Sequence, residues 1–183
     1  MLSVREITAD DIPLLVSYWL DSDPDFMMGM GVDLAKLPER ESLTKMLSAQ
    51  LAQDYTEKQS YALIWLIDQK AVGHCNVNKI EFGKSAFMHL HVWQSKHRQK
   101  GMGSEFVKLS LPHFFEKLQL ETIYCEPYAL NPSPNKTLQK LGFTFEKEYV
   151  TTPGYLNFEQ PVKRWSLSKN TFERSAKTTG PTS

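Results

Sequence analysis

The sequence lacks net charge and long hydrophobic runs. Its 21 lysine and arginine residues balance 21 aspartate and glutamate residues, so no global field draws it towards nucleic acid or an anionic membrane. No apolar stretch approaches the roughly 20 residues that a membrane-spanning helix needs, and the first residues lack the basic and apolar regions of a signal peptide. These absences predict a cytoplasmic protein that binds neither nucleic acid nor membrane.

Cysteine is equally scarce, with Cys75 and Cys125 as the two examples in 183 residues. Both lie in predicted buried strands, and we expect free thiols in a reducing compartment. No cysteine or serine stands beside a basic partner in a recognisable motif, so the sequence does not favour a covalent acyl-enzyme. We also expect no metal site.

The length predicts one α+β domain over residues 1–168, followed by a polar tail over residues 169–183 that we expect to be disordered. Residues 21–38, rich in Asp, Gly and Met, are predicted to form a loop. Apolar periodicity predicts the other elements. Strands are expected at 2–7, 60–67, 71–81, 86–93, 122–125, 143–150 and 158–167, and helices from residue 9 to 20 and at 39–53, 104–118 and 131–141.

The most informative segment is residues 89–104, His-Leu-His-Val-Trp-Gln-Ser-Lys-His-Arg-Gln-Lys-Gly-Met-Gly-Ser, which joins a predicted strand to a predicted helix. The first backbone N–H groups of a helix lack intrahelical partners, and they attract anions together with the positive helix end. Glycines let a phosphate approach the backbone closely. The candidate phosphate-binding residues are Arg98, Gln99, Lys100, Gly101, Met102, Gly103 and Ser104.

The residues of this turn also allow other interpretations. The turn is compatible with an ordinary glycine-rich connection. A P-loop would need lysine after the second glycine, whereas Lys100 precedes Gly101. A dinucleotide-binding fingerprint has Gly101 and Gly103 in place, and Glu126 as a ribose-binding acid, but Phe106 replaces the third glycine. A dinucleotide-binding protein therefore remains an alternative.

Two motifs carry a family resemblance. Arg98-Gln-Lys-Gly-Met-Gly103 matches the pattern Gln/Arg-x-x-Gly-x-Gly/Ala, and Asn131 is followed by Lys140-Leu-Gly-Phe143. With the order of elements, they resemble the GCN5-related N-acetyltransferase (GNAT) superfamily, and most of all its ribosomal-protein and small-molecule branch. The resemblance implies a sheet of six to seven mostly antiparallel strands, flanked by about four helices and splayed between strands four and five. It also implies acetyl-CoA as co-substrate.

The resemblance places the cofactor on particular residues. The pyrophosphate would bind the amides from Gln99 to Ser104. The pantetheine arm would pair with the backbone of His91, Val92 and Trp93 as an added strand, with further contacts from Asn131 and Asn135.

Candidates for proton transfer lie near the same strand. His89 and His91 are two apart on a strand and project from one face, and imidazole is suited to proton transfer around neutrality. Glu126 is the alternative base. The alternative is that His89 and His91 are only packed within the strand and that Glu126 is only a charged residue at a strand end. Many relatives have a tyrosine that acts as the acid at the helix position that is Leu138 here. Tyr128 or Asn135 is predicted to donate to the thiolate instead, and the alternative proton sources are solvent and the ammonium product.

The acceptor is predicted to bind the loop after the first helix, through Asp25, Phe26, Met28 and Met30, which combine acids for a cation with an apolar surface. The alternative is a solvated acidic loop that covers the core. The predicted activity is direct acetyl transfer to a primary amine, on a small molecule or a peptide N-terminus. A catalytically silent acyl-CoA sensor is the alternative. A monomer or homodimer is expected.

Overall fold

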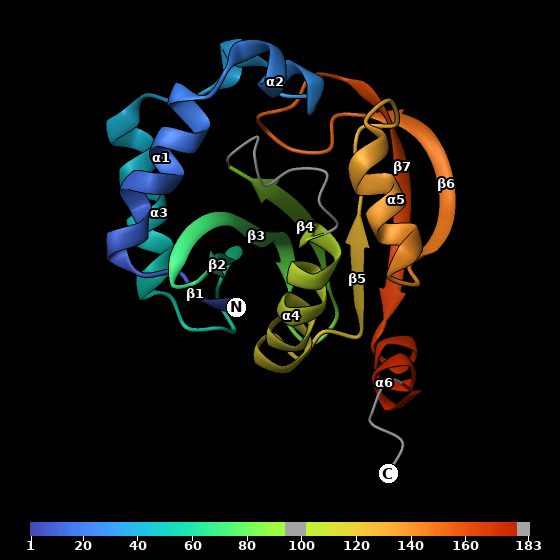
Figure 1. Cartoon of the computed structure of the whole chain (residues 1–183). Coiled ribbons are helices and arrows are strands. Elements are labelled where there is room, and N and C mark those ends of the chain that lie inside the picture. The colour runs from blue at the N-terminus through green and yellow to red at the C-terminus, as the bar shows by residue number, and fades with distance from the viewer. Residues whose placement is uncertain (94–101, 179–183) are drawn as a thin grey trace.

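The computed structural model of the chain describes residues 1–93 and 102–178. Within these residues the strands form one sheet of seven, in the order β1-β2-β3-β4-β5-β7-β6 (Figure 1). All neighbouring strands are antiparallel except β4 and β5, which confirms the predicted α+β class and mostly antiparallel sheet. The strands are β1 (Leu2–Glu6), β2 (Ser60–Ile67), β3 (Lys70–Glu81), β4 (Ser85–Val92), β5 (Thr122–Cys125), β6 (Thr144–Thr151) and β7 (Gln160–Ser168).

The described part of the chain contains six α-helices and two short 3-10 helices, where about four helices were predicted. None of these helices has the length and apolar character needed to cross a membrane, and the cytoplasmic location stays a prediction. The helices are η1 (Ala9–Asp11), α1 (Ile12–Asp21), α2 (Pro24–Gly29), η2 (Leu34–Lys36), α3 (Arg40–Ala52), α4 (Met102–Lys117), α5 (Pro132–Lys140) and α6 (Lys169–Thr178).

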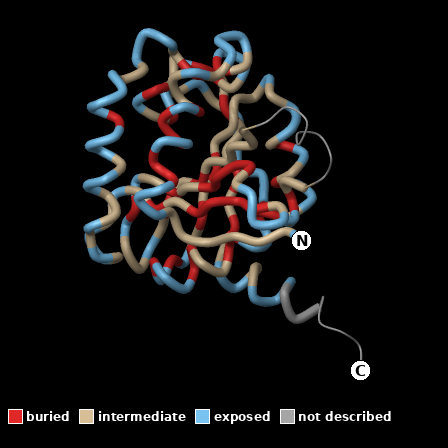
Figure 2. The backbone as a smooth tube through the Cα atoms, turned by 60° about the vertical axis from the view of Figure 1, so that its left-hand side comes forward, coloured by how far each residue is buried: buried red, intermediate tan, exposed pale blue. Residues whose placement is uncertain are grey.

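Helices pack on both faces of the sheet, so β2 is buried on both sides. Leu63 and Trp65 belong to the main core, where the Trp65 ring stacks on Phe106 of α4 with ring centroids 4.9 Å apart. Ile64 belongs to a second core on the opposite face, together with Leu15 of α1. The continuous apolar run of β2 follows from this double burial. Figure 2 shows the resulting buried segments in the central strands.

Helix α2 lies inside the segment that was predicted to be a loop. Asp23 Oδ1 accepts a hydrogen bond from the Phe26 backbone N–H at 2.8 Å, and Pro24 occupies the first helical position. Both features stabilise helix starts. The prediction was wrong here because six residues are too few to show a helical period.

Helix α6 occupies most of the segment predicted to be a disordered tail. Ser168 Oγ accepts from the Thr171 N–H at 3.2 Å, which caps the helix. The Phe172 ring stacks on Phe115 of α4 with ring centroids 5.0 Å apart. A single partly buried aromatic in a polar segment gives no periodic signal, so the sequence did not reveal this contact. Residues 179–183 lie outside the described residues.

Candidate active site

Strands β4 and β5 diverge near the middle of the sheet, where the splay was predicted. Their parallel pairing covers Ser85 to Phe87 on β4 and Thr122 to Tyr124 on β5. At the point of divergence the Cys125 thiol donates to the Met88 carbonyl at 3.0 Å. Beyond it β4 continues to Val92 while β5 ends at Cys125. One edge of β4 is therefore not paired with β5 over its last residues.

A cavity of about 500 Å³ opens beside this edge. It lies between β4, the start of α4, one side of α5 and the end of α2, so it joins segments that are far apart in the sequence. Its size is that of a small-molecule or cofactor site. The lining residues are Phe26, Gly29, Met30, Trp65, Leu90, Val92, Gly103, Ser104, Asn131, Ser133, Pro134, Lys136, Thr137 and Lys140.

Alternation along β4 decides which backbone groups face this cavity. The Trp93 N–H donates to the Val72 carbonyl at 2.9 Å on the β3 side. In an antiparallel ladder, every second residue turns its backbone N–H and C=O groups towards the same neighbouring strand. His91, two residues before Trp93, therefore also turns these groups towards β3. Leu90 and Val92 therefore turn their backbone groups towards the open edge. Of the three residues predicted to pair with the pantetheine arm, Val92 turns its backbone groups towards the open edge, whereas His91 and Trp93 turn theirs towards β3. Leu90, for which no contact was predicted, has the same orientation as Val92.

The start of α4 forms the wall opposite. Ser104 is 4% exposed, and Gly103 lies beside it in the cavity lining. A Cβ atom added to Gly103 would meet no atom within 4 Å. Met102 packs against the main core. The predicted phosphate contacts Arg98, Gln99, Lys100 and Gly101 lie outside the described residues.

Helix α5 uses its two predicted asparagines differently. Asn131 lines the cavity and caps α5, because its Oδ1 accepts from the Ser133 N–H at 3.3 Å. Asn135 is buried. Its Nδ2 donates to the Tyr128 and Asn131 carbonyls at 3.2 and 2.8 Å, and its Oδ1 accepts from Trp165 Nε1 at 2.9 Å. Both amide hydrogens of Asn135 are thus engaged within the protein, so the structure gives it a structural role in place of the predicted cofactor contact.

His89 and Glu126 lie on the two sides of the splay. The β4 and β5 pairing has a constant offset, Ser85 with Thr122 and Phe87 with Tyr124. Continued past the divergence, the same offset of 37 sets His89 opposite Glu126. Both residues belong to the sheet face opposite Leu90 and Val92, because side chains alternate along a strand.

Each of these two groups is held by neighbours. His89 Nε2 lies 3.1 Å from Asn78 Oδ1. Since an amide oxygen only accepts, Nε2 carries the proton and Nδ1 keeps its lone pair. The Glu126 side chain is 5% exposed, accepts a hydrogen bond from the Tyr149 hydroxyl and pairs with Arg164 at 3.5 Å.

His91 is packed away from the cavity against β3 and α1. Its Nδ1 lies 3.0 Å from the Tyr18 hydroxyl, and its ring stacks on His74 with centroids 4.4 Å apart. The indole N–H of Trp93 donates to His74 Nδ1 at 2.7 Å. We call Tyr18, His74, His91 and Trp93 the histidine cluster.

Burial keeps the histidines of this face neutral. It lowers the pKa of His74 to about 3 and that of His89 to about 4, where Lys79 adds to the effect. Burial also lowers the pKa of His91 well below its ordinary value, with smaller effects of the neighbouring histidines. A neutral imidazole has a lone pair to accept a proton, although a depressed pKa makes it a weaker base.

Two of the remaining candidates line the cavity and three do not. Phe26 and Met30 line it, whereas Asp25 and Met28 are exposed and outside the lining. Tyr128 is outside the lining too, and its ring packs edge-on against Phe158, with centroids 5.9 Å apart.

The segment after α2 is tied to the start of β7. The Gly31 carbonyl accepts from Asn157 Nδ2 at 2.9 Å and from Gln160 Nε2 at 2.8 Å. Gly31 has a φ of +88°, and a Cβ there would lie 2.2 Å from Gln160 Oε1. We call Gly31, Asn157 and Gln160 the Gly31 clasp. It fixes the position of the adjacent cavity residue Met30.

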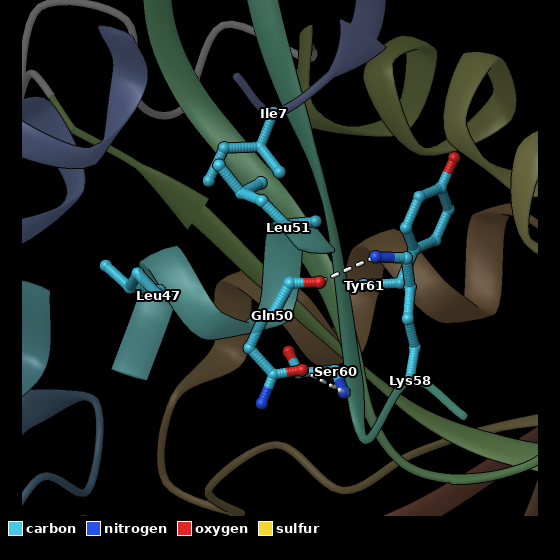
Figure 3. A pocket seen from close by; sticks show the side chains of 8 residues that line it. Ile7, Leu47, Gln50, Leu51, Lys58, Ser60 and Tyr61 are labelled. Atoms are coloured by element: carbon cyan, nitrogen blue, oxygen red, sulfur yellow. Dashed lines mark hydrogen bonds between the residues drawn. The ribbon is translucent and has the colours of Figure 1, made fainter. Parts of the chain in front are cut away.

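A second cavity lies between α3 and β2 (Figure 3). Leu47 and Leu51 supply apolar surface, and Gln50 bonds to Lys58 Nζ and to the Ser60 N–H at 2.6 and 3.1 Å. Its volume is about 30 Å³, enough for one or two water molecules. It is a packing gap and not a ligand site.

Cys75 and Cys125 are both buried and form no disulfide. Burial raises the pKa of both thiols, that of Cys125 to about 12. Neither is therefore an ionised nucleophile near neutrality. Among residues 1–93 and 102–178 no cluster of His, Cys, Asp or Glu has the arrangement of a metal site.

The sequence model of the acetyltransferase (GNAT) domain matches residues 2–144. The chain belongs to the GNAT family. A sequence search of curated proteins finds no match. The GNAT assignment agrees with the splayed sheet and with the cavity beside it. The sheet of residues 1–93 and 102–178 has one parallel pair, so it is not the doubly wound parallel sheet that a dinucleotide-binding domain requires.

Solved structures share this GNAT fold at low sequence identity. A spermidine N-acetyltransferase from Vibrio cholerae, in complex with CoA and spermine, is 17% identical with a TM-score of 0.77, covering 94% of this chain and 98% of that one. RimL, a ribosomal-protein alpha-N-acetyltransferase in complex with coenzyme A, is 15% identical with a TM-score of 0.75, covering 93% and 95%. An aminoglycoside acetyltransferase in complex with coenzyme A and kanamycin is 14% identical with a TM-score of 0.74, covering 96% and 99%.

Proposed function

We propose that the protein is an acetyl-CoA-dependent N-acetyltransferase that moves an acetyl group to a primary amine. The observation that carries this proposal is the 500 Å³ cavity, which joins the start of α4 to the open edge of β4. A helix start suits the pyrophosphate, and a strand edge that β5 does not cover suits the extended pantetheine arm. Three structural neighbours are complexes with coenzyme A.

In this proposal Gly103 and Ser104 help to hold the pyrophosphate, together with the predicted contacts from Arg98 to Gly101. Leu90 and Val92 pair with the pantetheine arm, and Asn131 lies beside it. Acetyl-CoA supplies the activated thioester. Backbone N–H groups at the β4 edge polarise its carbonyl and stabilise the tetrahedral intermediate.

We propose direct attack by the amine in a ternary complex. Both cysteines are buried protonated thiols, so a covalent acyl-enzyme has no ionised sulfur to form it. A direct route needs a neutral amine at the thioester carbonyl and a group that takes its proton.

His89 is our proposed proton acceptor, because Asn78 holds the Nε2 proton and leaves Nδ1 with a lone pair. Glu126, on the other side of the splay, would attract the amine as a cation before it loses its proton. Tyr128 stays the proposed donor to the departing thiolate, since Asn135 is engaged elsewhere.

The acceptor would approach from the side of Glu126, with Phe26 and Met30 at the end of the cavity. Structural neighbours acetylate spermidine, an aminoglycoside or a ribosomal protein. A small amine or a peptide with a free α-amino group is therefore the proposed acceptor class.

The test measures CoA thiol release from acetyl-CoA with spermidine, kanamycin and a peptide bearing a free N-terminus. We expect turnover with at least one of them. Gly103→Glu should abolish acetyl-CoA binding by adding a carboxylate to the phosphate site, whereas Gly103→Ala should weaken it far less. Because a Cβ at Gly103 meets no atom within 4 Å, both variants should fold.

Two results would overturn the proposal. Wild-type protein that does not bind acetyl-CoA would refute the cofactor assignment. Tight binding without thiol release over a broad amine panel would instead favour the catalytically silent acyl-CoA sensor.

A further inference from the structure

Helix α5 presents two lysines to the cofactor cavity. Lys136 and Lys140 both line it, next to Thr137. Residues four apart lie on the same side of a helix, with Cβ atoms about 5–6 Å from each other. The two ammonium groups therefore form a pair of positive charges, with Gly103 and Ser104 of α4 in the same lining.

No carboxylate in the described residues neutralises this pair. Neither lysine has an ion pair within 4.0 Å, although six other described lysines do. Helix α5 itself, Pro-Ser-Pro-Asn-Lys-Thr-Leu-Gln-Lys, has no acidic residue. Both lysines are exposed. An unneutralised pair of cations at the margin of a cavity attracts an anionic group of its ligand.

Coenzyme A carries more phosphate than a helix start accommodates. Its pyrophosphate suits the amide donors at the start of α4. Its third phosphate, a dianion on the 3′-oxygen of the ribose, needs cations of its own. We propose that Lys136 and Lys140 bind the ribose 3′-phosphate of coenzyme A, and that α5 thereby selects this cofactor over its 3′-dephospho form. The inference rests on the proposed function.

Isothermal titration calorimetry with CoA and with 3′-dephospho-CoA tests the assignment. The Lys136→Ala/Lys140→Ala double variant should bind CoA about tenfold more weakly, which corresponds to about 1.4 kcal/mol. Its affinity for 3′-dephospho-CoA should stay within twofold of wild type. A double variant with arginine at both positions should retain wild-type affinity for CoA. A thermal melt establishes that the variants are folded.

Lys70 provides the matched control. It is exposed, it is the first residue of β3, directly after the turn that joins β2 to β3, and it does not line the cavity. Lys70→Ala should bind both ligands like wild type, which excludes a general effect of lost charge.

The outcomes separate this inference from the proposed function. Equal weakening for CoA and 3′-dephospho-CoA would assign the lysines to the pyrophosphate and overturn the proposal. Unchanged CoA affinity in the alanine variant would overturn it as well. Wild-type protein that binds neither ligand would refute the proposed function itself.

Discussion

The histidine cluster should make the fold sensitive to mild acid. His74 is 2% exposed, and burial lowers its pKa to about 3, whereas an unfolded histidine has a pKa of about 6.5. Because the folded pKa lies below the unfolded one, the unfolded chain binds a proton first as the pH falls. Stability is therefore complete above about pH 6.5 and is lost progressively below it.

The magnitude follows from the two pKa values. At pH 5.0 protonation stabilises the unfolded chain through His74 by about 2 kcal/mol relative to pH 7.5, because each pH unit below the unfolded pKa corresponds to about 1.4 kcal/mol. His89 and His91 act in the same direction. This loss is a large part of the typical 5–15 kcal/mol that stabilises a domain.

The variant that isolates the effect is His74→Asn. Its Oδ1 can accept the Trp93 indole N–H in place of Nδ1, but asparagine takes up no proton. The free energy of unfolding, from urea titrations followed by circular dichroism, should fall about 2 kcal/mol less between pH 7.5 and 5.0 in the variant than in wild type. Trp93→Phe, the control, should lower stability at both values and keep the wild-type pH dependence. Equal acid sensitivity of wild type and His74→Asn would refute the reasoning.

Three further predictions concern the site and its supports. His89→Gln should lower kcat about 10²-fold with little change in the KM for acetyl-CoA. Glu126→Gln should chiefly raise the KM for the amine. Steady-state kinetic constants that are unchanged in both variants would contradict the proposed proton transfer to His89. Arg5→Met should cost about 2–3 kcal/mol in urea unfolding, because it leaves the 3% exposed Asp11 carboxylate without its cation; a cost below 0.5 kcal/mol would show that the pair is unimportant. Gly31→Ala should lower the melting temperature far more than Gly83→Ala, since both have positive φ but a Cβ meets Gln160 only at Gly31.

The sequence predicted those parts of the molecule that repeat or that carry a motif. Strands and long helices have a period that a short window reveals. The glycine-containing turn and Asn131 indicated the family before any fold was known. Gly103, Ser104, Val92 and Asn131 were predicted cofactor contacts, and all four line one cavity.

The sequence could not reveal contacts between distant segments. The bond from Trp165 to Asn135 spans 30 residues, and it converts a predicted cofactor contact into a structural amide. His91 was expected near the cofactor, but the alternation of β4 turns it towards Tyr18 on α1. Only the hydrogen bond from Trp93 to Val72 on β3 shows which residues of β4 turn their backbone groups towards the open edge. No cofactor contact was predicted for Lys136 or Lys140, although Lys140 belongs to the Lys140-Leu-Gly-Phe143 motif, because only the structure shows that both lysines line the cavity.

The Gly31 clasp has a consequence for the order of events during synthesis. Gly31 and Gln160 are 129 residues apart, and contacts of such separation form late because they close a long loop. A ribosome therefore has to make β7 before the end of α2 can be fixed in place. Until then Phe26 and Met30 lack their final support, so the nascent chain can complete its central strands well before this end of the cavity is fixed.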